Sequence, residues 1–130
     1  MLVGCYYGCP IAFEEGDKGR PRFFVLAQLV AYNEIADAVK VKMHDLLGSS
    51  EYYREIIQHN VFFAQAVTRC EASPGGVVEG RWGRGTIVSR VSEPYSEGKP
   101  YWYWIKLPNG KHVKACETEL KFDYTQMNYA

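Results

Sequence analysis

Residues 101–111 read YWYWIKLPNGK, and this stretch is the clearest structural signal in the sequence. Aromatic and β-branched residues favour a strand, in which successive side chains point to opposite faces. One face then carries Tyr101, Tyr103, Ile105 and Leu107, and the other carries Trp102, Trp104 and Lys106. The Asn109-Gly110 pair favours a tight hairpin turn, because both residues tolerate positive φ angles. We therefore expect residues 112–115 to form the return strand.

The pattern continues on both sides of this hairpin. A glycine-rich segment at residues 80–85 precedes a predicted strand at residues 86–91, and a polar loop follows at residues 93–100. After the hairpin, residues 117–121 predict one turn of 3₁₀ helix and then a last short strand. Ser73-Pro74-Gly75-Gly76 is a strong break in the pattern. It predicts a boundary between a first module, residues 1–72, and a second, residues 73–130.

The first half also divides into strand-length pieces. We expect a short strand at residues 10–13, a polar turn at 14–21, a long bent strand at 23–32 and a turn at 33–37. Residues 39–43 alternate apolar and charged side chains, which is typical of a half-buried strand. Ser49 or Ser50 followed by Glu51 resembles a helix start, so the sequence predicts an α-helix over residues 51–59. Residues 61–70 either extend that helix or begin a strand.

The two halves share a pattern. Val39, Val41 and Met43 alternate before Gly48, as the residues of the 101–107 strand alternate before Gly110. The side chains themselves differ between the halves. Two interpretations follow: a tandem repeat of one small barrel, or a single β-rich domain with an inserted helix.

The stretch from Gly80 to Lys121 resembles a Src-homology-3-like small barrel of the Tudor or KOW type. The resemblance lies in Gly83-x-Gly85-Thr86-Ile87-Val88, in residues 103–111 and in Glu119-Leu120, and it covers about a third of the chain. Two such modules in tandem would be similar to the N-terminal region of bacterial helicase-like ATPases that act on RNA polymerase. The resemblance implies a mainly β fold of one or two small barrels, here with one intervening α-helix. It also implies binding through loops, exposed strands or an aromatic cage.

Composition excludes several classes of protein. Fifteen basic and fifteen acidic residues give a formal charge of zero, which argues against a polybasic protein that neutralises phosphates over its whole surface. No apolar run approaches the ~20 residues that span a bilayer, and the N-terminus does not resemble a signal peptide. We therefore expect a cytoplasmic or nuclear protein that is not secreted and contacts no membrane. Its four cysteines are expected to be reduced.

The charge is unevenly divided along the chain. Residues 79–130 hold eight basic and six acidic side chains, whereas residues 1–78 hold seven and nine. Arg81, Arg84 and Arg90 lie close together in sequence, and Lys106 lies on the tryptophan side of its predicted strand. These residues are candidates for contact with phosphates, and the alternative is an ordinary solvated surface.

Aromatic residues make up 15% of the chain, and all three tryptophans fall in the second half. Trp102 and Trp104 are either covered by the N-terminal half or form a platform for a ligand or a second copy of the chain. Trp82 either caps the mouth of the barrel or builds a cage with Tyr95, to which Glu93 or Glu97 would add an acidic group. Such a cage binds methylated lysine or arginine.

These observations favour a non-catalytic binding module, acting within a larger protein or complex. The expected partner is nucleic acid or a nucleic-acid-bound protein. The alternatives are a protein-interaction or self-assembly module, such as a homodimer, and a reader of peptides with methylated side chains. No catalytic residue, metal or cofactor is predicted. The candidate ligand-binding residues are Arg81, Trp82, Arg84, Arg90, Tyr95, Trp102, Trp104 and Lys106.

Overall fold

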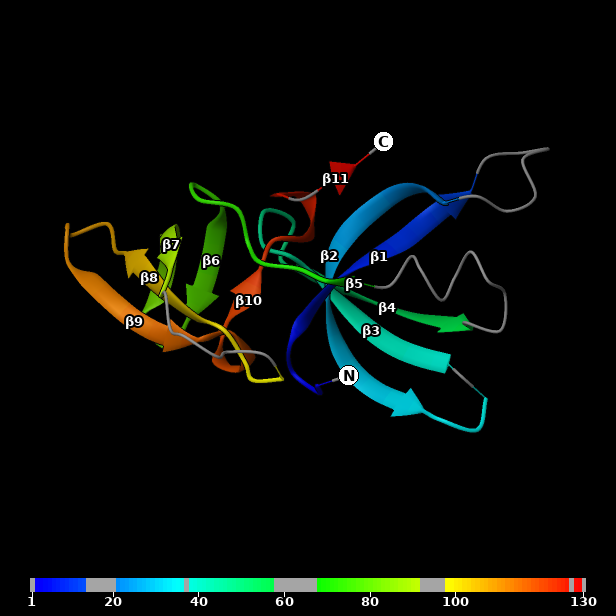
Figure 1. The fold of residues 1–130 in the computed structure, drawn as a ribbon. Helices are drawn as coiled ribbons and strands as arrows, with labels where there is room; N and C mark the ends of the chain where they lie inside the picture. Colours follow the sequence, from blue (N-terminus) through cyan, green and yellow to red (C-terminus); the bar gives the residue numbers. More distant parts are fainter. Residues whose placement is uncertain are drawn as a thin grey trace.

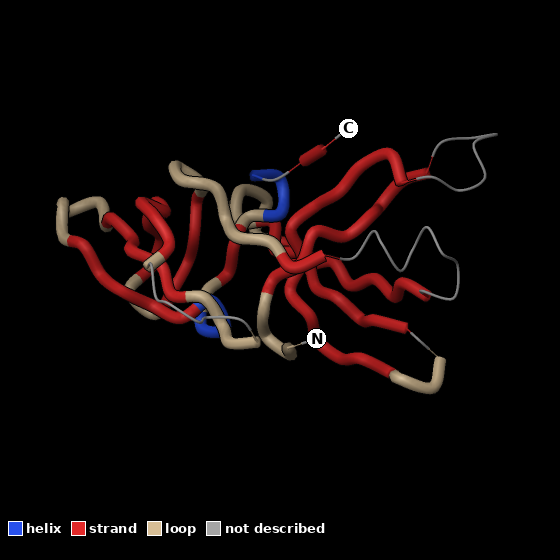
Figure 2. Tube along the Cα trace, in the orientation of Figure 1, coloured by secondary structure: helices blue, strands red, loops and turns tan. Residues whose placement is uncertain are grey.

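The fold consists of two antiparallel sheets that lie side by side (Figure 1). A computed structural model describes residues 2–13, 21–36, 38–57, 68–91, 98–126 and 128–129. The first sheet has the order β4-β3-β2-β1-β5 and the second β10-β6-β7-β8-β9. Strands dominate both parts, and two short 3₁₀ turns interrupt them (Figure 2). The prediction of a mainly β chain is therefore confirmed.

The strand bounds are as follows. The first sheet contains β1 (Tyr6–Phe13), β2 (Pro21–Asn33), β3 (Ala38–Asp45), β4 (Ser50–Ile57) and β5 (Thr68–Arg69). The second contains β6 (Val77–Gly80), β7 (Gly83–Arg90), β8 (Trp102–Lys106), β9 (His112–Cys116) and β10 (Lys121–Phe122). The 3₁₀ segments are η1 (Glu117–Glu119) and η2 (Tyr124–Gln126), and the short β11 (Asn128–Tyr129) pairs with β2.

The α-helix predicted over residues 51–59 is wrong. Ser50–Ile57 forms β4, which pairs with β3 along its whole length. The reason lies in the preceding turn: Asp45 Oδ1 accepts the Gly48 N–H at 2.9 Å, and Ser49 adopts a φ of 54°. Ser49 is thus a turn residue of a hairpin and not a helix cap. Residues 58 and 59 of that prediction lie outside the described residues.

No α-helix occurs in the described ranges. Of the uncertain stretch 61–70, the structure describes only residues 68–70, of which Thr68–Arg69 form β5. None of the described helical segments is long or apolar enough to cross a membrane.

The other predicted strands are found, several of them longer than expected. The long strand at 23–32 corresponds to β2, which bends where its register with β3 shifts between Leu29 and Ala31. The alternating strand at 39–43 is the centre of β3. In the second half, a turn at the predicted place joins β8 to β9, but only Gly110 has a positive φ, 86°. The Gly110 N–H bonds to the Leu107 carbonyl at 2.9 Å, so Pro108 and Asn109 are the central residues of the turn. The 3₁₀ turn at 117–119 and the short strand after it are also present.

Two hydrophobic cores hold the sheets. The first covers one face of the first sheet and contains Cys5, Tyr7, Cys9, Val25, Ala27, Leu29, Val39, Val41 and Met43. The second combines Tyr6 and Leu26 of the first sheet with Ala72, Val78, Ile87, Tyr103, Ile105, Ala115, Leu120 and Phe122. Because Tyr6 and Tyr7 point to opposite faces of β1, this one strand contributes to both cores.

Tyr6 links the two sheets through its ring and its hydroxyl. The ring is buried and lies 4.3 Å from the ring of Phe122, centroid to centroid. The hydroxyl donates to the carbonyl of Leu120 and accepts the Phe122 N–H at 3.3 Å. A buried hydroxyl without such partners would be costly, so these bonds fix Tyr6 at the junction.

A buried ion pair, Arg69 with Glu117, also joins the sheets. Glu117 is fully buried at the start of η1 and contacts the Arg69 guanidinium with both carboxylate oxygens. The same carboxylate accepts the backbone N–H groups of Tyr6, at 3.3 Å, and Tyr101, at 2.8 Å. The guanidinium carbon lies 3.9 Å from the centroid of the Tyr101 ring. Every oxygen of this buried acid is therefore satisfied by a group from elsewhere in the chain.

None of the four cysteines, all in described positions, forms a disulfide. Burial raises the pKa of the thiols of Cys5 and Cys9 to about 12. Both thiols therefore stay protonated at neutral pH.

Candidate nucleic-acid interface

Trp102 and Trp104 lie on the solvent-facing side of β8. Along this strand exposed and buried residues alternate, with Tyr103 and Ile105 fully buried and the two indoles 39% and 42% exposed. The period of two expected from the sequence is thus present, and the tryptophans occupy its outer face. Exposed indoles next to each other on one strand are unusual, because large apolar side chains normally contribute to a core.

The neighbours of Trp104 on the adjacent strands are polar or basic, whereas Trp102 lies opposite the buried Cys116. The register places Ser89 and Lys114 opposite Trp104, and Thr86 and His112 opposite Lys106. Lys106, His112 and Lys114 are all exposed. The Lys114 ammonium lies 5.6 Å from the centroid of the Trp102 ring, within cation–π range.

We call this surface the tryptophan face. It is defined by the exposed residues of β7, β8 and β9 that the register pairs on this side: Thr86, Ser89, Trp102, Trp104, Lys106, His112 and Lys114. Val88, which is 42% exposed, lies beside Ser89 at the bulge of β7. None of these paired positions carries a carboxylate. The face therefore combines aromatic rings with positive charge.

The predicted arginines do not gather on the tryptophan face. Arg84 donates to the carbonyl of Leu46 and lies 3.6 Å from a Glu79 carboxylate oxygen. Arg90 pairs with Glu71 at 3.2 Å and stacks on the ring of Tyr101. Both arginines are thus engaged within the protein, and of the predicted basic residues only Lys106 lies with Trp102 and Trp104.

Trp82 lies over Gly80 at the turn between β6 and β7. A side chain at Gly80 would come within 2.7 Å of the indole, so glycine allows this close approach. The indole packs, partly buried, against the second core. It also lines a cavity of about 250 Å³ together with Arg81, Lys114, Glu119 and Leu120. The other predicted cage residues, Tyr95, Glu93 and Glu97, lie outside the described residues.

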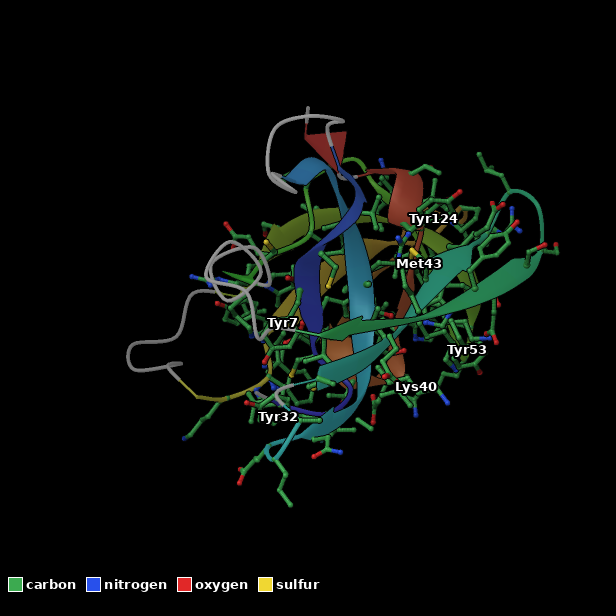
Figure 3. The ribbon with its side chains drawn as sticks, turned by 90° about the vertical axis from the view of Figure 1, so that its right-hand side faces the viewer. Tyr7, Tyr32, Lys40, Met43, Tyr53 and Tyr124 are labelled. Carbon is green, nitrogen blue, oxygen red and sulfur yellow. The ribbon has the colours of Figure 1, made fainter. Side chains whose placement is uncertain are left out.

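A second exposed aromatic residue with basic neighbours lies on the first sheet. Tyr53 on β4 is 57% exposed, and the ammonium groups of Lys40 and Lys42 each lie 5.5 Å from its ring centroid (Figure 3). The register adds Glu55 and Glu51 to the same face. The charge around Tyr53 is therefore mixed, unlike that of the tryptophan face. Sequence reasoning missed this group because it assigned Tyr53 to a helix.

A polar pocket of about 410 Å³, the junction pocket, lies where the two sheets meet. Its walls include His44 of β3, Glu51 of β4, Glu79 of β6, Arg84 of β7 and Lys121 of β10. His44 is 1% exposed, and its Nδ1 lies 3.4 Å from Glu51 Oε1. The sequence showed only that His44 and Asp45 cannot pair within one strand. The contact with Glu51 depends on the β3–β4 register, which could not be predicted while residue 51 was assigned to a helix.

The folded protein is expected to lose stability as the pH falls below about 6.5, the ordinary pKa of histidine. Burial lowers the pKa of His44; Lys42 and Lys121 lower it further, and Glu51 opposes them. The unfolded chain then binds a proton that the folded chain does not, so acid favours unfolding by at most about 1.4 kcal/mol per pH unit. Urea unfolding between pH 5 and 7.5 should give a flatter profile for His44→Gln than for the native chain. Exposed His112→Gln is the control, and equal slopes for the two variants would refute this assignment.

Comparison of the chain with protein-family models, with curated proteins and with solved structures finds no match.

Proposed function

We propose that this chain is a non-catalytic module that binds single-stranded nucleic acid on the tryptophan face. The single observation that carries the proposal is the pair of exposed indoles, Trp102 and Trp104, beside Lys106 and Lys114. Unpaired bases stack on such rings, and lysines neutralise the phosphates beside them. The likeness to Tudor and KOW barrels is part of this proposal, since small β folds of that kind bind through exposed strands.

A single strand fits this surface better than a duplex does. The basic groups of the face are two lysines and one histidine, and the whole chain has no net charge. Duplex binding without base contacts depends on many neutralised phosphates. Stacking instead requires base faces that are free, as they are in a single strand.

The alternative functions fit the described residues less well. Among these residues, the cavity beside Trp82 offers one aromatic ring, one carboxylate (Glu119) and two cationic side chains, Arg81 and Lys114, so it lacks the several rings of a cage and its charge is net positive. A self-assembly interface is also disfavoured, because lysine is depleted in the cores of such interfaces. Lys106 and Lys114 flank the two indoles, where such a core would lie.

Binding to an oligothymidine strand is expected to weaken as salt increases. Each phosphate contact contributes about 0.7 to the slope of log affinity against log salt for a single strand. Lys106→Gln and Lys114→Gln should each reduce that slope by about this amount, and the double variant by roughly twice as much. Fluorescence anisotropy with a labelled strand measures both affinity and slope.

Arg54→Gln is the matched control, since Arg54 is exposed on β4 of the other sheet. It should leave the slope unchanged. Equal slopes for the native chain and the double lysine variant would contradict the proposal, as would the absence of binding at low salt.

A further inference from the structure

A groove of about 610 Å³ lies beside the tryptophan face and shares two residues with it. Thr86 of β7 and Lys106 of β8, which the register pairs, belong to both surfaces. Val77 of β6 is paired with Thr86 on its other side and also lines the groove. We call this surface the Leu47 groove, after a residue of its wall. Because of the shared residues, it continues the tryptophan face.

The walls of the Leu47 groove are mainly apolar and come from both sheets. The second sheet contributes Val77 together with Leu107 and Pro108, which follow β8, and the β3–β4 turn of the first sheet contributes Leu47. Leu47 is 72% exposed, although the preceding Leu46 is buried. Apolar groups that gather on an exposed surface are typical of an interaction site.

Arg84 holds the turn that carries Leu47 against the second sheet. Its guanidinium donates to the carbonyl of Leu46, one residue before Leu47. Within the same turn, Asp45 Oδ1 accepts the Gly48 N–H at 2.9 Å. A contact between the two sheets therefore determines where Leu47 lies, and Arg84 is a positioning residue for this wall of the groove.

The charge of the Leu47 groove suits a ligand that carries phosphates. Among the described residues that line it, Arg84 and Lys106 are charged, and both are cationic. The Glu79 carboxylate lies 3.6 Å from Arg84 Nε and reduces its effective charge, but it lines the junction pocket and not the groove. The exposed Lys106 is thus the main source of positive potential. The described lining of the junction pocket and of the cavity beside Trp82, in contrast, includes carboxylates.

The Leu47 groove lies on the line of the outward side chains of β8. A strand rises about 3.3 Å per residue, so outward residues two positions apart lie about 6.6 Å from each other. Trp102, Trp104 and Lys106 follow one another in this way, and Pro108 of the groove comes next. A single strand that stacks bases on Trp102 and Trp104 and continues in the same direction therefore reaches the groove.

We propose that the Leu47 groove holds a further unpaired base of the strand that stacks on Trp102 and Trp104. Unstacked bases are held between aromatic and apolar side chains in proteins that extrude them from a duplex, and the groove offers such apolar walls. The adjoining phosphate then faces Lys106. This inference rests on the proposed function and extends it, since the site takes at least three successive nucleotides and uses both sheets.

The test compares an eight-nucleotide and a two-nucleotide oligothymidine strand. Anisotropy of a labelled strand measures binding of the longer one, and NMR titration of the Trp102 and Trp104 indole signals measures the shorter. Leu47→Ser should weaken binding of the longer strand by about 3- to 10-fold, because a base covers only part of the leucine side chain. It should not change binding of the shorter strand, whose two bases take the two indoles. Leu47→Phe keeps an apolar wall and should bind both strands like the native chain.

Ile35→Ser is the matched control, since Ile35 is fully exposed in the β2–β3 turn and lies outside the groove lining. It should bind both strands like the native chain.

The possible failures are distinguishable. If Leu47→Ser, shown by circular dichroism to be folded, binds the longer strand as tightly as the native chain, the groove site is refuted and the proposed function stands. A groove that serves an acidic peptide instead would give this result. An equal loss for both strand lengths also refutes the groove site. If neither strand binds at low salt, both proposals are refuted.

Discussion

Replacing Glu117 with alanine is expected to destabilise the protein by about 3–5 kcal/mol, which is a large part of the stability of a small domain. The substitution leaves the Arg69 guanidinium, whose side chain is 23% exposed, without its counterion. It also removes the acceptor of the Tyr6 and Tyr101 N–H groups. Tyr6 belongs to the first sheet and Tyr101 directly precedes β8 of the second, so the substitution weakens the contact between the two sheets. Urea unfolding followed by tryptophan fluorescence measures the change.

Two further variants show whether the charge pair is the cause. Glu119→Ala removes an exposed acid from the same 3₁₀ turn and should change stability by less than about 0.5 kcal/mol. Glu117→Gln keeps an acceptor for one N–H group but loses the charge. The stability of this variant should therefore lie between the stabilities of Glu117→Ala and Glu119→Ala. Similar unfolding midpoints for Glu117→Ala and Glu119→Ala would show that the buried pair does not hold the sheets together.

Trp102→Ala and Trp104→Ala are each expected to weaken binding of an oligothymidine strand by about 5- to 150-fold. This range corresponds to ~1–3 kcal/mol for one base stacked on one aromatic ring. Because both indoles lie on the solvent face of β8, the substitutions should leave the fold intact. Phenylalanine at either position should restore part of the affinity, since it still offers a ring. Anisotropy titrations at fixed salt give the comparison.

Tyr52→Ala is the control for this series. Tyr52 is 47% exposed on β4, outside the tryptophan face, and its loss removes a similar apolar area from the surface. It should not change the affinity. Unchanged binding by both tryptophan variants would place the ligand elsewhere.

In the second half, the local pattern of the sequence predicted the β8–β9 hairpin and the 3₁₀ turn after it, but not β6. The alternation in residues 101–107 and the Asn109-Gly110 turn specify the β8–β9 hairpin, because both signals act over a few residues. The same alternation correctly placed Trp102, Trp104 and Lys106 on one face. Their exposure could not be derived, since it depends on what the rest of the chain covers.

The failures of sequence reasoning share a cause. Residues 50–57 contain a helix-like start and yet form β4, because pairing with β3 outweighs a weak local preference. Glu117 has the sequence context of an ordinary surface acid, and only its contacts with Arg69 and Tyr6, far away in the chain, explain its burial. The junction pocket likewise combines residues of five strands. Long-range contacts of this kind leave no local pattern.

An NMR titration of the three tryptophan indole N–H signals with an oligothymidine strand tests whether the tryptophan face holds the nucleic acid. We expect the signals of Trp102 and Trp104 to shift progressively and to saturate together, while that of Trp82, packed over Gly80, moves little. Sedimentation on the same samples should show one protein per strand and no self-association. Shifts confined to Trp82, or no shift at any indole while the strand binds, would contradict the claim that the tryptophan face holds the nucleic acid.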